Sequence, residues 1–96
     1  MPKGYWIVHV TVRDPEAYAD YVQRDTPIIE GYGGRFIVRG PAAETPEDPQ
    51  KDRHVVIEFP DLATASACYH SDGYQEVMQI RRAHSDSDIV IVEGTI

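Results

Sequence analysis

The fold is decided by residues 4–22, GYWIVHVTVRDPEAYADYV, in which a strand pattern runs directly into the start of a helix. From Tyr5 to Val12 the residues are mostly aromatic, β-branched or histidine, and they alternate between two faces as in a strand. Asp14 is placed to cap a helix, and Pro15 follows at the first helical position, where a missing N–H costs nothing. The stretch therefore predicts one strand followed at once by one helix.

The rest of the chain extends this unit into a longer order of elements. Residues 35–39 and 54–59 are typical of strands, and residues 88–93 predict a fourth strand that is apolar on both sides and therefore central or well covered. Pro27 is expected to kink the first helix or to restart it. A second helical region, 62–84, is expected to break near Ser71-Asp72-Gly73.

The resulting order is βαββαβ, which predicts the α+β class. This order consists of two βαβ halves with right-handed crossovers. Together they form a ferredoxin-like sandwich, a four-stranded antiparallel sheet that carries both helices on one face. Residues 1–96 are expected to form a single domain, because 96 residues are too few for two. The segment 40–52 is Pro-rich and acidic, and we interpret it as a solvated loop, with a functional lid as the alternative.

Composition excludes several classes of partner. The formal net charge is −7, so the field of the chain repels nucleic acid and anionic membrane surfaces. Cys68 is the only cysteine, which excludes an internal disulfide and predicts a cytoplasmic protein. Its neighbours are small and uncharged, so a packed structural thiol is favoured over a nucleophile.

The two faces of the predicted sheet differ in polarity. Alternation gives one apolar face, made by Trp6, Val8, Val10, Val12, Phe36, Val38, Val55, Ile57 and Phe59. The other face is mixed, with Tyr5, Ile7, His9, Thr11, Arg35, Ile37, Arg39, His54, Val56 and Glu58. Two helices cover only one face, and the mixed face holds too much apolar area to be left in water. A second copy of the chain, packed face to face, is the expected cover, so the sequence predicts a homodimer.

The chain also resembles a known family. The resemblance is carried by residues 4–22, by YGGRFIVRG (32–40), by HVVIEFPDLATASACYHSDGYQEV (54–77) and by DIVIVEG (88–94). These segments are similar to the bacterial family called domain of unknown function 1330, within the dimeric α+β barrel superfamily. The resemblance implies the fold and the dimer, and it implies no established reaction. Asp72-Gly73 departs from the Pro-Glu that is usual in the family at this point.

One candidate site lies on the mixed face. Glu58 is expected to reach Arg39 on one side and His9 on the other, so that His9 acts as general base, Glu58 orients it and Arg39 holds an anionic or carbonyl oxygen. The alternative is a partly buried salt bridge that only fixes the register. A metal site of His9, His54 and Glu58 is disfavoured, because residues four apart on a strand are about 13 Å apart.

A second candidate is a pocket between the helices and the sheet. Four tyrosines fall at core-facing positions of the helices: Tyr18, Tyr21, Tyr69 and Tyr74. Such a pocket suits a small aromatic or carbonyl compound, with Tyr18, Tyr69 or Tyr74 contacting the ligand; alternatively the tyrosines only cover a small core. The leading hypothesis is cofactor-independent enzyme chemistry of the monooxygenase or isomerase kind, with no cofactor and no metal expected. The rival is a non-catalytic ligand-binding or stress-related dimer.

Overall fold

The computed structural model describes residues 2–48 and 51–96. The elements follow the predicted order along the chain: β1 (Gly4–Val12), α1 (Pro15–Gly31), β2 (Arg35–Pro41), β3 (Arg53–Phe59), α2 (Leu62–His70), α3 (Asp72–His84) and β4 (Ser85–Glu93). The second helical region divides at Ser71, whose hydroxyl accepts a hydrogen bond from the backbone N–H of Tyr74 and so caps α3. The ferredoxin-like α+β prediction is confirmed.

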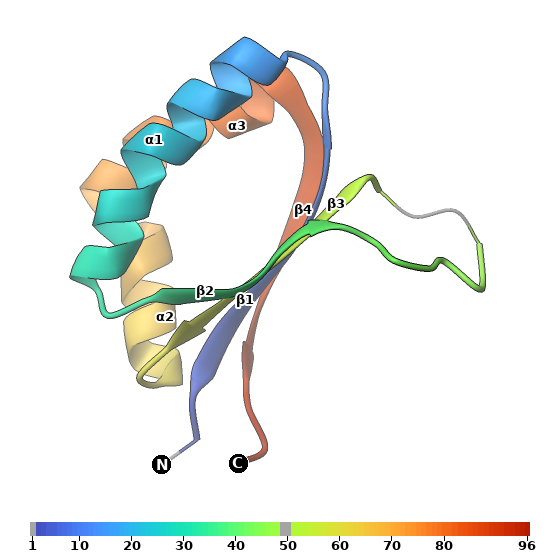
Figure 1. Ribbon diagram of the computed structural model, residues 1–96. Coiled ribbons are helices and arrows are strands. Elements are labelled where there is room, and N and C mark those ends of the chain that lie inside the picture. The colour runs from blue at the N-terminus through green and yellow to red at the C-terminus, as the bar shows by residue number, and fades with distance from the viewer. Residues whose placement is uncertain (1, 49–50) are drawn as a thin grey trace.

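The four strands form one antiparallel sheet in the order β2-β3-β1-β4. Figure 1 shows helices α1, α2 and α3 on one face of this sheet; within residues 2–48 and 51–96 no helix or strand covers the other face, which we call the open face. The prediction that the fourth strand is central or well covered was wrong within the subunit, because β4 lies at an edge and Val90 on it is 49% exposed. Its two-sided apolar pattern reflects the open face rather than a central place in the sheet.

Helix α1 forms as its sequence predicts at the start and differs near its end. Asp14 caps it by accepting a hydrogen bond from the Ala17 N–H at 3.2 Å. The helix then continues through Pro27 as a single element, so the predicted restart does not occur. Ile29, which follows the proline, is fully buried in the core, and this packing holds the last turn in place.

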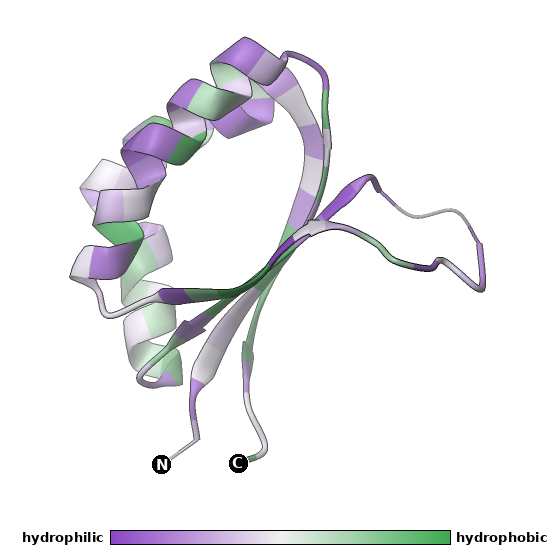
Figure 2. Ribbon diagram, viewed as in Figure 1, coloured by the Kyte–Doolittle hydropathy of each residue, from purple (hydrophilic) through white to green (hydrophobic). Residues whose placement is uncertain are grey.

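The core lies between the helices and the sheet. Its largest fully buried side chains come from both layers: Trp6, Tyr74, Phe59, Ile29, Val10 and Cys68. Figure 2 shows α1 banded with hydrophilic and hydrophobic residues, as expected of a helix with one buried side. Burial raises the pKa of the Cys68 thiol to about 12, so this cysteine is the packed thiol that its neighbours predict.

A β-bulge in β2 changes which face its side chains use. The register shifts between Phe36 and Val38, so Ile37 and Val38 are both exposed, at 47% each. After the bulge, Arg39 lies opposite the buried Val55, and its guanidinium carbon is 3.6 Å from the centre of the Phe36 ring. The sequence-based assignment of Val38 to the core face and Arg39 to the mixed face was therefore wrong, because strict alternation fails at a bulge.

Residues 42–48, which follow β2, extend away from the body of the molecule (Figure 1). They are exposed, in agreement with the solvated acidic loop expected there; residues 49–50 lie outside the described residues. We call residues 42–48 the arm. Within the described ranges, none of the helices is both long enough and apolar enough to span a membrane.

Candidate functional site

Glu58 lies on the open face in a network of its own. Its carboxylate accepts hydrogen bonds from the Tyr5 hydroxyl at 3.0 Å and from Arg35 Nη2 at 2.8 Å. The Arg35 guanidinium, followed by the Tyr5 hydroxyl, holds the pKa of this carboxyl below its usual range. Glu58 is thus engaged by two side chains, neither of which was its predicted partner.

His9 is paired with another histidine. Its Nδ1 lies 2.8 Å from Nδ1 of His54, directly across from it on β3, whereas Glu58 lies across from Tyr5. Four residues of strand separate the two positions on β3, a distance of about 13 Å. The predicted grouping of His9, Glu58 and Arg39 does not form within the subunit, since the first two are far apart and Arg39 lies on the opposite face.

The opposite, helix-covered face contains a partly enclosed hollow of about 60 Å³, which we call the inner hollow. It is lined from the sheet and from α1 and α3 by Trp6, Val8, Tyr18, Tyr21, Val22, Asp25, Phe36, Arg39, Arg53, Val55, Ile57 and Arg81. A second, more open hollow of about 460 Å³, the vestibule, is lined by Val12, Pro15, Tyr18, Ala19, Val22 and Arg53. The two hollows share Tyr18, Val22 and Arg53, so they adjoin. The vestibule offers room for a small ring of a ligand, and the inner hollow offers room for a polar group of the same ligand.

Asp25 is the acidic group of the inner hollow. It is 5% exposed, and burial raises its pKa to about 6. The hydroxyls of Tyr21 and Thr26, followed by the charges of Arg39 and Arg81, act in the opposite direction. A carboxyl that ionises close to neutral pH inside a hollow can both take up and return a proton.

Three arginines from other elements line the same hollow: Arg39 on β2, Arg53 on β3 and Arg81 on α3. Arg81 is 4% exposed and donates from Nη1 to the Ser87 hydroxyl at 2.6 Å. The buried Nε atoms of Arg53 and Arg81 have no hydrogen-bond partner within residues 2–48 and 51–96. Three cations against one carboxylate make the hollow a place of local positive charge in an acidic protein.

The tyrosines predicted at the pocket are divided between two places. Tyr18 lines both hollows, and the Tyr74 hydroxyl lies 2.6 Å from that of Tyr21 in the wall of the inner hollow. Burial, followed by the interaction with Tyr74, raises the pKa of Tyr21 well above its usual range. Tyr69 instead donates to the sulfur of Met78 at 3.3 Å and does not line either hollow.

Sequence reasoning missed Asp25, Arg53 and Arg81 as residues of the site. One signal was present, since Asp25 interrupts the apolar 3–4 spacing of α1 and so sits on its buried side. Arg81 lies in the last turn of α3, where a cation suits the negative end of the helix, so its burial cannot be predicted from its position in the sequence. The described ranges contain no group of three or more His, Cys, Asp and Glu side chains that could hold a metal ion.

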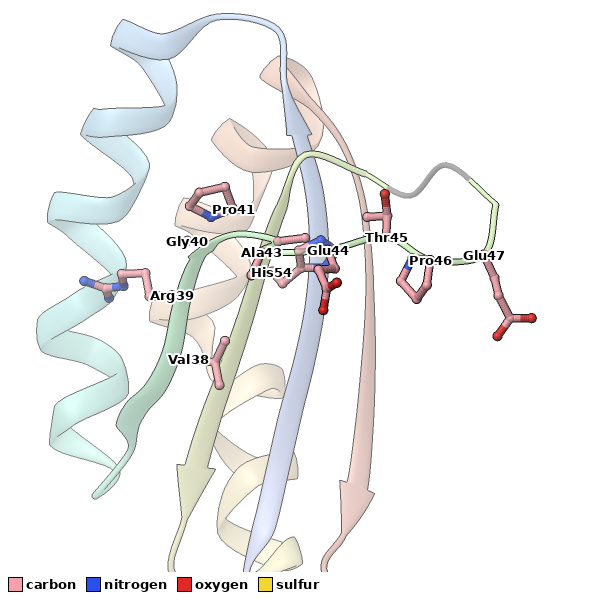
Figure 3. Close-up of a pocket in the computed structure, with 11 residues that line it drawn as sticks. Val38, Arg39, Gly40, Pro41, Ala43, Glu44, Thr45, Pro46, Glu47 and His54 are labelled. Carbon is pink, nitrogen blue, oxygen red and sulfur yellow. The ribbon is translucent and has the colours of Figure 1, made fainter.

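A larger hollow, of about 760 Å³, lies under the arm on the other side of β2 (Figure 3). It is lined by residues 38–47 and by His54. In Figure 3 the Arg39 side chain is directed away from this hollow, toward α1. The arm residues that form its wall are exposed, so it is an open recess rather than an enclosed site, and the inner hollow is the better candidate.

Comparison with known proteins places the chain among ferredoxin-like folds. A model of the family described as "Domain of unknown function (DUF1330)" matches residues 3–95. A protein of unknown function from Rhodopseudomonas palustris is 22% identical, with 99% of this chain and 84% of that chain covered at a TM-score of 0.81. No curated protein matches significantly.

Two further solved structures share the fold at lower identity. SnoaB, a cofactor-independent oxygenase from Streptomyces nogalater, is 17% identical, with 96% of this chain and 92% of that chain covered at a TM-score of 0.68. A dimeric ferredoxin-like protein of unknown function from Jannaschia sp. CCS1 is 16% identical, with coverages of 95% and 98% and a TM-score of 0.64. At these identities the likeness shows a common fold.

Proposed function

The chain belongs to the DUF1330 family, and we propose that within it this protein binds a small organic anion and transfers a proton next to a carbonyl group. The site is the inner hollow with its vestibule, and Asp25 is the group that moves the proton. The likeness to a cofactor-independent oxygenase supports such chemistry, since the residues of this hollow supply a base and cations without a bound cofactor.

A single observation carries the proposal: a buried carboxyl with its pKa raised to about 6 shares a hollow with two guanidinium groups whose Nε atoms are unpaired among the described residues. Buried polar atoms are paired in nearly all proteins, so unpaired ones on two residues that line the hollow point to a missing partner. A carboxylate or carbonyl oxygen is the partner that a guanidinium group prefers. The hollow therefore suits a ligand with an oxyanion at its inner end.

The proposed reaction is enolisation. Asp25 in its ionised form takes a proton from the carbon beside the carbonyl group, and the electron pair of that C–H bond moves into the enolate. Arg39 or Arg81 stabilises the charge that forms on the oxygen. Protonated Asp25 then returns its proton to carbon, so the enzyme ends as it began and no oxidant is consumed.

Deuterium exchange into phenylpyruvate tests this reaction. The compound joins a ring to a carbonyl group and a carboxylate, and we expect the protein to speed incorporation of deuterium at its methylene carbon in D₂O, followed by NMR. Asp25→Asn should lower the rate about a hundredfold or more, as expected for loss of a general base. Asp20→Asn, on the same helix but paired with the exposed Arg24, is the matched control and should leave the rate unchanged. Binding without any exchange would make the protein a non-catalytic binder instead.

Anion binding has its own test. Trp6 is the only tryptophan and lines the inner hollow, so its fluorescence should change when benzoate binds and should respond much less to neutral benzamide. Arg39→Gln should weaken benzoate binding about tenfold, because it removes one charge-assisted hydrogen bond. Arg35→Gln is the control, since Arg35 lies on the same strand but contacts Glu58 on the open face. Equal loss in both variants would contradict the assignment.

We also propose that the active form is a homodimer that joins two open faces, located in the reducing cytoplasm that the lone Cys68 suits. Ile37, Val38 and Val90 are each about half exposed on edge strands of this face. Partly exposed Ile7 and Val56 lie between them, in register with each other and with Val90. A continuous apolar strip of this kind is typical of a buried interface. Two copies of this chain related by a two-fold axis would cover each other's strip, so no other partner is needed. The net charge of −7 argues against nucleic acid as the partner.

Val90→Lys tests the dimer. An unpaired ammonium group in the centre of an apolar interface should weaken association roughly a hundredfold, measured by sedimentation velocity at several concentrations. Leu62→Lys is the matched control, since Leu62 is an exposed apolar residue on α2, away from the open face, and should leave the dimer intact. A monomeric unmodified protein at tens of micromolar would refute the dimer.

A further inference from the structure

The His9–His54 pair is left unused by the proposed reaction, and its geometry has a consequence of its own. The two Nδ1 atoms lie 2.8 Å apart and the rings are inclined at 73°, so one Nδ1 donates a proton to the other. Such a bond requires that at least one ring be neutral, with a bare Nδ1 as acceptor. When both rings are protonated, both Nδ1 atoms carry a hydrogen, and the contact turns from attractive to repulsive.

The pair lies on the open face, in register with residues of the neighbouring strands. Gly40 of β2 lies across from His54, and Asp88 of β4 lies across from His9. The Nε2 atom of His54 is buried and has no hydrogen-bond partner within residues 2–48 and 51–96. A positively charged ring at this position would therefore hold an N–H without a hydrogen-bond acceptor inside the fold.

The charged groups around the pair offer little compensation. Asp88 is held by Lys51 at 2.8 Å, and Glu58, further along β3, is held by Arg35. Asp86 lies across from Thr11 and acts on Lys51. The carboxylates of the arm that share a hollow with His54 are Glu44 and Glu47, and both belong to exposed residues.

We propose that the His9–His54 pair makes the homodimer acid-sensitive: the proton shared between the two Nδ1 atoms holds the rings together on the open face, and protonation of both rings breaks the pair and weakens association. This inference rests on the homodimer proposed above. In a two-fold dimer the two pairs would bring four positive charges to one interface, each of which must lose water on association. Histidine is the side chain that ordinarily changes charge between pH 5 and 8, so association is compared at two pH values within this range.

Sedimentation velocity at pH 7.5 and pH 5.5, at constant ionic strength, tests the inference. We expect the dissociation constant of the unmodified protein to rise at least about tenfold at the lower pH. His9→Asn and His54→Asn replace a titrating ring with a neutral amide, and each should reduce this change to less than about twofold. The other two histidines are the matched controls: His70→Asn and His84→Asn should keep the full effect. Asp25→Asn should also keep it, which separates the pair from the carboxyl that ionises near pH 6.

The imidazole nitrogens report on the pair directly. In ¹⁵N-labelled protein at pH 7.5 we expect one ring of the pair to carry its proton on Nδ1 and the other on Nε2. A monomer at both pH values would overturn the dimer and this inference together. A dimer of unchanged affinity at pH 5.5, an acid effect that survives in His9→Asn and His54→Asn, or two rings that both carry the proton on Nε2 would overturn this inference alone.

Discussion

Replacing Asp25 with asparagine is expected to stabilise the protein at neutral pH while removing its proton-transfer activity. The carboxyl is buried at 5% exposure, and burial raises its pKa from 3.8 to about 6. A difference of this size between folded and unfolded states corresponds to roughly 1–3 kcal/mol of folding free energy lost on ionisation. Asparagine keeps the shape and carries no charge, so the variant escapes this cost.

The sign of the pH dependence follows from the raised pKa. The protonated carboxyl suits the folded state, so its contribution to stability is fully present below about pH 3.8 and is lost as the pH rises through about 6. The free energy of unfolding, from urea denaturation between pH 4 and 8, should thus favour Asp25→Asn at pH 7.5 and show little difference at pH 4. Asp20→Asn, on the exposed side of α1, should follow the unmodified protein throughout. An Asp25→Asn variant that is less stable at pH 7.5 would show that the carboxylate is a structural partner of the arginines.

A gain in stability together with a loss of activity would be informative about the site. A residue kept in the chain for packing alone is expected to stabilise the fold, whereas functional groups are commonly retained at a cost to stability. Asp25 belongs to the second kind, because it is an ionisable group that is buried. It shares the hollow with three arginines, and among the described residues it makes no ion pair shorter than 4.0 Å with any of them. The charges of the hollow are arranged around a space rather than in contact.

The second large effect is expected at Gly4, where a methyl group has no room. A Cβ atom at this position would lie 2.5 Å from the backbone oxygen of Asp61 and 2.7 Å from Cα of Leu62. Both contacts are with backbone at the start of α2, which cannot move aside as a side chain would. We expect Gly4→Ala to lower the free energy of unfolding by roughly 2–4 kcal/mol.

Gly31→Ala is the matched control for this prediction. Gly31 is at the end of α1, and a Cβ atom there would meet nothing within 4 Å. Alanine is the better helix former, so this variant should be unchanged or more stable by up to about 1 kcal/mol. Thermal unfolding followed by circular dichroism compares the two variants. Similar melting temperatures for both would refute the close packing of β1 against the turn that leads into α2.

Much of the fold could be predicted from the sequence because it depends on local patterns. The order of elements follows from period-2 and 3–4 spacing, and the starts of α1 and α3 follow from Asp14 and Ser71, whose side chains accept from backbone N–H groups within the same turn. The apolar content of the open face is likewise visible in the alternation of β1 and β3. Each of these features is determined by residues that lie only a few positions apart in the sequence.

The site depended on features that no local pattern contains. A one-residue bulge between Phe36 and Val38 moved Arg39 from the open face to the inner hollow, and bulges leave no periodic signal in a strand of seven residues. The pairing of His9 with His54 rather than Glu58 was set by the strand register, which fixes neighbours across 45 residues of chain. Asp25, Arg53 and Arg81 line the same hollow, although they come from three elements far apart in sequence. Burial and pKa are properties of such long-range neighbours, so the sequence by itself determined the layers and only the tertiary structure decided which polar groups share a space.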